Sequence, residues 1–402
     1  MRVISFTPVN VTGELHMFGG EGTVIHADFR DAADELVSRF GGSARVVYLD
    51  PPFNTGGAFE FRRGKTQLAY RDSVPWDEHL ELIRSAAELS KKLLKPDGTF
   101  FLHIDCSVSA YCRVMLDEIF GRDAFTNEIV WAYRSGGRST RSFSNKHDVI
   151  LMYRMSADSY FNIGAVGVPR GQKRRNHMKR CVDETGRVFY SIKTGGREYR
   201  YYEDDPVYPS DVWDDVEHLN QRDPERTGFL TQKPEALLKR IILSCSEEGD
   251  TVVDLFGGSG TTAAVAAKLS RSFVSVDSGA VASAVTKKRL LERCLKMRLY
   301  DANRPLVFEL GQGSAGELPD LEKYFDITEK NGRFTFTVKR LSPGARPFML
   351  SAGSVDAGVF TANAYCLDPV FGDGIKADAG KCVHLIDESF GEYYFVPGVE
   401  ER

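Results

Sequence analysis

Hydrophobic and polar positions follow two different periods along the first 300 residues of the chain. The segment 77–98 places apolar residues three and four positions apart and ends in Pro96-Asp97-Gly98, which predicts an amphipathic helix with a sharp stop. The same period predicts further helices over 109–121, 234–250 and 280–297. Short apolar runs predict buried strands near 24–28, 46–49, 99–105, 128–133, 147–154, 251–255 and 272–277. Strands that alternate with helices predict a parallel, doubly wound α/β sheet.

A basic segment interrupts this pattern. From about residue 135 to residue 200, Arg and Lys outnumber Asp and Glu, and the stretch VPRGQKRRNHMKR shows no apolar period. We therefore interpret residues 134–210 as an insertion between two parts of one core, 1–133 and 211–300. The core strands on both sides of the insertion are then expected to share a single sheet.

The last quarter of the chain has a third pattern. Short strand-like runs such as FTFTVKRL, GVFTANAYCL and EYYFVPG alternate with turns rich in Gly, Pro and Asp. This pattern predicts a small β-rich appendage over residues 301–402.

Composition narrows the class of protein only a little. With 402 residues, 42% of them hydrophobic and 27% charged, the chain can bury a large core. No apolar run is long enough for a membrane helix and the N-terminus does not resemble a signal peptide, so we expect a cytoplasmic protein without a membrane partner. The seven cysteines include no CxxC pair, so we expect reduced thiols and no metal site.

The stretch DLFGGSGTT (254–262) is typical of a cofactor-binding turn. A strand brings Asp254 to the carboxyl edge of the sheet, glycines allow a close backbone approach, and Thr261 begins a helix. A second acid, Asp277, ends the next strand, where such sheets present a carboxylate to ribose hydroxyls. The spacing fits NAD as well as S-adenosylmethionine, whereas the absence of Gly-Lys-Ser/Thr excludes a nucleotide P-loop. A glycine turn that only packs is the alternative interpretation.

The stretch VVYLDPPF (46–53) suggests a catalytic turn and not a cofactor-binding one. A buried strand runs into Asp50-Pro51-Pro52-Phe53, where the prolines force a turn at the edge of the sheet that binds ligands. A carboxylate at Asp50 and the carbonyl of Pro51 can accept both hydrogens of an exocyclic base amine and localise its lone pair for methyl transfer. Phe53 offers a ring face for stacking of an extruded base. A merely rigid turn is the alternative for this tetrapeptide.

Together, the two motifs resemble the beta class of amino-directed DNA methyltransferases, in which the catalytic motif precedes the cofactor motif. The chain has this order, with DPPFNTG at 50–56 and FGGSGTT at 256–262, and the resemblance covers residues 20–298. Its most specific stretch is ERTGFLTQKPEALLKRII at 225–242. The resemblance implies a Rossmann-like, S-adenosylmethionine-dependent methyltransferase fold with circularly permuted motif order, in which the insertion at 134–210 is a target recognition region.

The resemblance also implies roles for individual residues. Asp50, Pro51, Pro52 and Phe53 are the expected catalytic residues. The expected cofactor-binding residues are Asp28 near the adenine, Thr231, Gln232, Lys233 and Pro234 at the methionine end, Asp254, Phe256, Gly258, Gly260 and Thr261 in the turn, and Asp277 at the ribose. Taken alone, Asp28 could instead cap a helix that begins near Arg30, and Lys233 could be a solvated surface lysine.

The basic insertion is the expected DNA-binding surface. Its densest cluster is Arg174, Arg175, Lys179 and Arg180, and aromatic residues are interleaved with the cations. The implied partner is double-stranded DNA, and a cognate restriction subunit and a homodimer are left open. A solvated charged face is the alternative interpretation, and the DNA sequence that is read cannot be inferred.

The predicted function is site-specific methylation of the exocyclic amino group of adenine in DNA, by base flipping and in-line transfer. Asp at the first motif position resembles adenine enzymes, whereas Phe53 stands where tyrosine is commoner in them. The alternatives are an enzyme that methylates cytosine amines or RNA, and a non-catalytic DNA-binding protein.

Overall fold

The structure of the chain is a computed structural model. It describes residues 2–8, 22–54, 56–63, 65–72, 74–133, 140–170, 178–220, 222–296, 306–307, 309–310, 318–356 and 359–401. The basic residues Arg174 and Arg175 lie outside the described residues.

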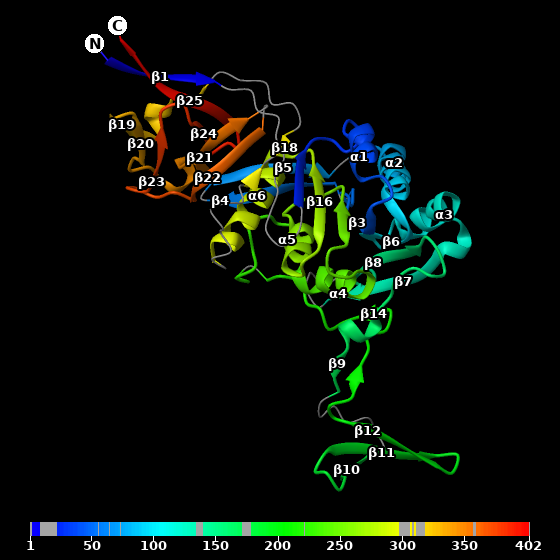
Figure 1. Ribbon diagram of the computed structural model, residues 1–402. Coiled ribbons are helices and arrows are strands. Elements are labelled where there is room, and N and C mark those ends of the chain that lie inside the picture. The colour runs from blue at the N-terminus through cyan, green and yellow to red at the C-terminus, as the bar shows by residue number, and fades with distance from the viewer. Residues whose placement is uncertain are drawn as a thin grey trace.

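A central sheet of nine described strands organises the body of the molecule (Figure 1). Its order across the sheet is β14 (Val212–Trp213), β7 (Phe125–Ala132), β8 (His147–Arg154), β6 (Leu94–Asp105), β3 (Ala44–Leu49), β15 (Thr251–Asp254), β16 (Ser272–Asp277), β2 (Gly22–His26) and β18 (Glu309–Leu310). Strands from both sides of the insertion therefore share one sheet, and that prediction is confirmed.

The expectation of a wholly parallel sheet is wrong at one strand. β8 runs antiparallel to both of its neighbours, β6 and β7, whereas β3, β15, β16 and β2 pair in parallel. β7 and β8 follow each other in the sequence, and the described residues between them, 133 and 140–146, include no crossover helix. A short connection of this kind joins antiparallel strands. The Rossmann-like α/β fold class is confirmed.

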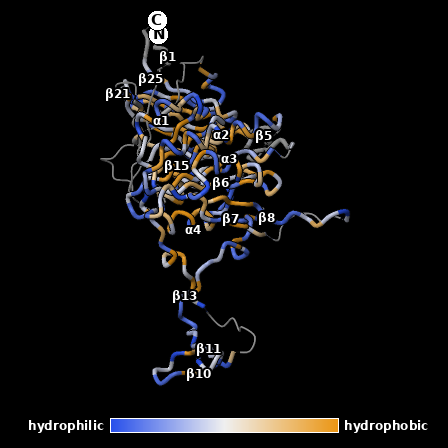
Figure 2. Tube along the Cα trace, turned by 90° about the vertical axis from the view of Figure 1, so that its right-hand side faces the viewer, coloured by the Kyte–Doolittle hydropathy of each residue, from blue (hydrophilic) through white to orange (hydrophobic). Residues whose placement is uncertain are grey.

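Helices cover both faces of the sheet. One face carries α1 (Ala33–Phe40), α2 (Trp76–Leu93) and α3 (Ser109–Phe120), and the other carries α4 (Glu235–Cys245), α5 (Thr261–Lys268) and α6 (Ala280–Lys296). Alternate residues of β3 serve the two faces: Val46 and Tyr48 pack with α4 to α6, and Val47 and Leu49 pack with α1 to α3. A strand buried on both faces needs a continuous apolar run, and VVYL supplies it. Hydrophobic positions gather in this body (Figure 2).

Within the insertion, β8 belongs to the central sheet, whereas the described residues between 168 and 207 form an arm that stands away from the body. β9 (Val168–Pro169) pairs with β13 (Pro206–Val207), and beyond this ribbon lies an antiparallel sheet of β10 (Lys179–Val182), β11 (Val188–Thr194) and β12 (Arg197–Tyr202) (Figure 1). A separate hairpin of β4 (Gly57–Arg63) and β5 (Lys65–Asp72) follows the DPPF turn.

A second β-rich unit contains most of the described C-terminal residues. Its larger sheet has the order β1 (Arg2–Pro8), β25 (Glu392–Glu401), β24 (Cys382–Ile386), β21 (Met349–Asp356), β22 (Val359–Leu367) and β17 (Leu306–Val307). Its smaller sheet consists of β19 (Phe325–Lys330), β20 (Arg333–Val338) and β23 (Gly374–Asp378). The N-terminal strand β1 thus pairs with the C-terminal strand β25. The segment boundaries inferred from the sequence stay predictions.

Candidate functional site

A cavity of about 800 Å³ opens where β3, β15 and β16 end. β3 and β15 are paired neighbours, so the turns that follow Leu49 and Asp254 face each other across one cleft. The cavity is large enough for a nucleoside-sized ligand, and the carboxyl edge of such a sheet is where ligands bind. Most of the predicted site residues line it: Asp28, Asp50, Pro51, Pro52, Phe53, Thr231, Gln232, Lys233, Asp254, Phe256, Gly258, Thr261 and Asp277.

The DPPF turn is held from behind by Asn54. This residue adopts a left-handed backbone conformation, with φ 56°, which asparagine tolerates better than most residues. Its side-chain amide donates to the carbonyl of Val74 at 3.0 Å and its side-chain oxygen accepts from the Val74 amide at 2.9 Å. The paired contact fixes the direction in which the chain leaves Phe53.

Lys233 forms an ion pair with Asp50. Its ammonium donates to both carboxylate oxygens, at 2.7 and 2.6 Å, and it lies 4.7 Å from the centre of the Phe53 ring. The two side chains are only 11% and 18% exposed, so water screens the pair weakly. Nothing in the sequence pairs these residues, which are 183 positions apart.

A chain of buried polar side chains continues behind Asp50. The Tyr48 hydroxyl lies 2.7 Å from Nδ1 of His103, and Nε2 of His103 lies 3.1 Å from the Asp148 carboxylate. Tyr133 donates to the other oxygen of Asp148 at 2.9 Å. Burial raises the pKa of Asp148, but its hydrogen bond and charge interaction with His103 outweigh this and lower the pKa overall. Asp148 therefore stays ionised beneath the DPPF turn.

The glycine turn is tightly closed by its own hydrogen bonds. Gly258 and Gly260 have φ of 51° and 71°, a region that favours glycine. The Gly258 amide donates to the Asp277 carboxylate at 2.8 Å, and the Gly257 amide donates to the Val276 carbonyl at 2.9 Å. A dinucleotide site offers the amides of this turn to a pyrophosphate, and here a carboxylate already occupies one of them.

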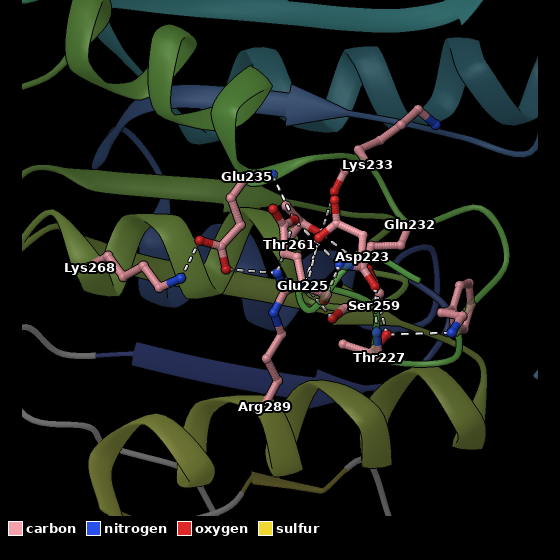
Figure 3. Close-up of polar contacts among 11 residues, drawn as sticks. Asp223, Glu225, Thr227, Gln232, Lys233, Glu235, Ser259, Thr261, Lys268 and Arg289 are labelled. Carbon is pink, nitrogen blue, oxygen red and sulfur yellow. Dashed lines mark hydrogen bonds and ion pairs between the residues drawn. The ribbon is translucent and has the colours of Figure 1, made fainter. Parts of the chain in front are cut away.

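Arg289 of α6 joins the glycine turn to the segment before α4. Its guanidinium donates to the Ser259 carbonyl at 3.2 Å, the Thr261 hydroxyl at 2.9 Å and the Glu235 carboxylate at 2.9 Å (Figure 3). Glu225 lies 3.6 Å from the same guanidinium and accepts from the Glu235 amide at 2.8 Å. One largely buried cation therefore connects two segments that both line the cavity.

Gln232 organises the TQKP stretch from within. Its side-chain amide donates to the Glu225 carbonyl at 2.8 Å, and its side-chain oxygen accepts from the amide and hydroxyl of Thr227 at 2.8 and 2.9 Å. With 3% exposure it is almost completely buried. The side chain shapes the loop that presents Lys233 to the cavity.

Several predicted residues lie elsewhere than in the cavity wall. Pro234 and Gly260 are the N-caps of α4 and α5, so they shape the cavity through the backbone. Lys179 and Arg180 are exposed on β10 of the arm.

Asp28 lies in the cavity wall and binds Arg30, whose guanidinium donates to it at 2.6 and 2.9 Å. Helix α1 begins at Ala33, so Asp28 is not its cap.

Four residues of these networks were missed from the sequence: His103, Asp148, Glu225 and Arg289. A polar residue inside an otherwise apolar strand, as in FFLHID and HDVILMYR, is the signal that could have identified the first two. Glu225 is the first residue of the ERTGFLTQKPEALLKRII stretch, and this position in the motif is the signal that could have identified it. Arg289 carries no such signal, since it resembles an ordinary surface charge in the sequence.

The family model described as DNA methylase matches residues 44–288, which is more than half of the chain. The chain belongs to the DNA methylase family. Its cofactor, as predicted, is S-adenosylmethionine.

Curated relatives match 62–65% of the chain. The type II methyltransferase M.HpaI of Haemophilus parainfluenzae is 30% identical over 62% of this chain and 68% of the relative. The DNA adenine methyltransferase YhdJ of Escherichia coli is 29% identical over 65% of this chain and 80% of the relative. The type II methyltransferase M.EcaI of Enterobacter cloacae is 28% identical over 62% of this chain, and the match spans 65% of that relative.

Solved structures show a more distant likeness. The M1.HpyAVI–SAM complex covers 66% of this chain with 18% identity and a TM-score of 0.43. The cytosine-N4-specific PvuII DNA methyltransferase covers 70% of this chain with 17% identity and a TM-score of 0.44.

The glycine turn of the cavity fits a nucleoside cofactor better than a cofactor that places a pyrophosphate there. Carboxylates line the cavity at Asp28, Asp50, Asp254 and Asp277, and cations line it at Arg30, Arg226 and Lys233. The Asp277 carboxylate occupies the Gly258 amide that a pyrophosphate would need, and a carboxylate at this position accepts from ribose hydroxyls. Within the described ranges no cluster of His, Cys, Asp and Glu could hold a metal ion, and no helix has the length and apolarity to span a membrane.

Asp254 gives the cavity a pH-dependent stability. Burial raises the pKa of its carboxyl to about 7, although hydrogen bonds from the Thr262 hydroxyl and the Phe256 amide act in the opposite direction. The folded protein then holds a proton that the unfolded chain releases near pH 3.8. This group stabilises the fold at low pH, and the contribution is lost as the pH rises towards 7.

We expect Asp254→Asn to remove this dependence, because the amide keeps the shape and cannot ionise. The free energy of unfolding of the wild type should fall relative to that of the variant by at most about 4 kcal/mol between about pH 4 and pH 7. Urea unfolding of both proteins at several pH values measures this difference. Parallel pH profiles would contradict the assignment to Asp254.

Proposed function

We propose that the chain transfers a methyl group from S-adenosylmethionine to the exocyclic amino group of adenine in double-stranded DNA. The observation that carries the proposal is the shared cavity: Asp50 and Phe53 stand on the turn after β3, and the glycine turn stands after the neighbouring β15. S-adenosylmethionine supplies an electrophilic methyl group when it is bound. The adjacent turns allow a base amine and that methyl group to meet inside one cleft.

The DPPF turn would receive an extruded base. Asp50 accepts one hydrogen of the amine and the Pro51 carbonyl accepts the other, which directs the nitrogen lone pair towards the methyl group. Phe53 stacks on the base, and this replaces part of the stacking lost when the base leaves the duplex. The two prolines and the Asn54–Val74 contacts hold the acceptors in place before the base arrives.

Lys233 occupies the same acceptor and the same ring face in the structure. Its ammonium donates to Asp50 and lies over Phe53, which are the two groups assigned to the base. In the proposed reaction the base amine therefore displaces Lys233 from Asp50. The released ammonium lies in the wall of the cofactor cavity, where it can bind the carboxylate at the methionine end of the cofactor, the role that the sequence resemblance implies.

Adenine is the proposed base. The acidic first position of the DPPF motif and the likeness to the adenine methyltransferase YhdJ support it. The relatives named as type II methyltransferases support a place in restriction and modification, with a cognate restriction enzyme as the expected companion.

The arm is the proposed DNA recognition element. It projects from the body beside the strands β7 and β14 and presents Lys179 and Arg180 on an exposed strand (Figure 1). Its cations also pair with carboxylates of the arm: Arg187 with Asp204 at 2.7 Å, Arg200 with Glu198 at 3.0 Å and Arg180 with Glu203 at 3.7 Å. The contact of Arg180 is the longest of the three and its side chain is half-exposed, so a phosphate can compete for this guanidinium more easily than for the other two.

We expect the purified protein to transfer tritiated methyl groups from S-adenosylmethionine to duplex DNA. Digestion of the DNA to nucleosides should place the label in N6-methyladenine. Label in N4-methylcytosine would overturn the adenine assignment and keep the amine chemistry, and label only in RNA would overturn the proposed substrate. Sequencing of the methylated DNA then maps the target site.

We expect Asp50→Asn to lower the single-turnover methylation rate by a factor of about 10² or more, because a neutral amide oxygen is a weaker acceptor for the base amine than a carboxylate. Calorimetry should show cofactor binding close to that of the wild type. Asp97→Asn is the control, because Asp97 forms an ion pair with Arg45 outside the cavity lining. Near-normal turnover in Asp50→Asn would refute its catalytic role.

We expect Lys179→Gln/Arg180→Gln to weaken DNA binding and reduce its salt dependence. Each lost phosphate contact should lower the slope of log affinity against log salt by roughly 0.9, or roughly 1.8 for the pair. Lys376→Gln/Lys381→Gln removes the same charge from exposed positions of the C-terminal unit and should leave the slope unchanged. Equal slopes for wild type and the arm variant would show that Lys179 and Arg180 are solvated surface residues that do not contact phosphates.

A further inference from the structure

Helix α6 is shared by the cofactor cavity and the C-terminal β-rich unit. Within four consecutive residues, Thr286 and Arg289 contact the glycine turn of the cavity, whereas Lys287 and Lys288 contact this unit. The family match ends at residue 288, so the C-terminal unit lies outside the matched region and its role is unassigned.

On the cavity side, α6 packs against the glycine turn without spare room. A Cβ placed on Gly260 would lie 2.6 Å from the Thr286 hydroxyl oxygen and 2.8 Å from its methyl carbon. The same Thr286 hydroxyl donates to the Gly258 carbonyl at 3.2 Å. Arg289 donates to the Ser259 carbonyl and to Thr261, as described above. A displacement of α6 by a few tenths of an ångström therefore must move the turn.

On the opposite side, α6 is bound to the C-terminal unit by ion pairs. Lys287 is completely buried and donates to the Glu392 carboxylate of β25 at 2.6 Å, and that side chain is 13% exposed. Lys288 contacts the Asp368 carboxylate after β22. Apolar side chains of the unit, including Phe348 and Phe390, belong to the same hydrophobic cluster as the buried face of α6.

The buried pair makes this contact specific in position. A buried ammonium that loses its carboxylate is strongly destabilised, so arrangements that keep Lys287 against Glu392 are favoured. An apolar contact alone would tolerate sliding of α6, whereas a directional charge-assisted hydrogen bond does not. The unit therefore defines the position of α6 along its axis.

We propose that the C-terminal β-rich unit positions the cofactor cavity: through Lys287–Glu392 it holds α6 where Thr286 and Arg289 shape the glycine turn. Glu392 is then a positioning residue for S-adenosylmethionine and touches neither cofactor nor DNA. This inference rests on the proposed function only through the cofactor, which binds without DNA.

The test compares two carboxylates of the C-terminal unit with similar burial. Glu392→Gln disturbs the contact with α6, whereas Glu388→Gln disturbs an equally buried carboxylate, 16% exposed, that binds Lys323 inside the unit. Calorimetry on the full-length proteins should show a dissociation constant for S-adenosylmethionine raised about tenfold in Glu392→Gln and within about twofold of wild type in Glu388→Gln. The KM for the cofactor should rise with it, while the rate at saturating cofactor stays close to wild type.

Thermal unfolding of each variant separates positioning from stability. Wild-type cofactor affinity in Glu392→Gln, or equal weakening in both variants, would overturn the proposal. If Glu392→Gln does not fold, the Asp368→Asn variant tests the proposal instead. This substitution weakens the contact of Asp368 with Lys288 of α6 at a half-exposed position. Asparagine tolerates the left-handed backbone conformation of residue 368. Weaker cofactor binding in Asp368→Asn supports the proposal, and unchanged binding overturns it. A wild-type protein that binds no S-adenosylmethionine would instead refute the cofactor itself.

Discussion

The parallel pairing of β3 with β15 is the constraint on which the rest of the structure depends. Val46 and Val47 lie beside Val252 and Val253, so the two strands end at the same edge of the sheet. The DPPF turn and the glycine turn, about two hundred residues apart in the sequence, are thereby brought to opposite walls of one cavity. Apolar residues bury both faces of β3, so its register cannot slip without exposing hydrophobic side chains.

Ion pairs connect the segments that the central sheet brings together around the cavity. The cavity gathers several carboxylates, and three buried or largely buried cations hold the surrounding segments together. Lys233 neutralises Asp50, Arg289 connects the glycine turn to the TQKP stretch, and Lys287 attaches α6 to the C-terminal unit. Each cation joins segments that are distant in sequence, and each is expensive to leave without its partner. The site is therefore a set of interlocking ion pairs on a rigid α/β frame.

Much of the frame was predictable, because periodicity and turn chemistry are local. The helices at α2, α3, α5 and α6 and the apolar strands of the core appear where the pattern placed them, although α4 ends at Cys245 and not near Gly249. The antiparallel direction of β8 was not predicted, since apolar periodicity carries no sign of strand direction. The polar chain through His103 and Asp148 was also missed, because its members come from three strands and meet only in the folded sheet.

The sequence by itself determined the chemistry: an acid and an aromatic held by prolines, a glycine turn before a helix, and an order of motifs that resembles one family of methyltransferases. These are properties of short segments, and short segments are read directly from the chain. Only the tertiary structure decided that Lys233 lies on Asp50, that Arg289 reaches the glycine turn, and that a C-terminal unit is anchored on α6. A side chain of either charge looks the same in a sequence whether it is solvated or buried. Its partner is chosen by the packing of elements that are far apart along the chain.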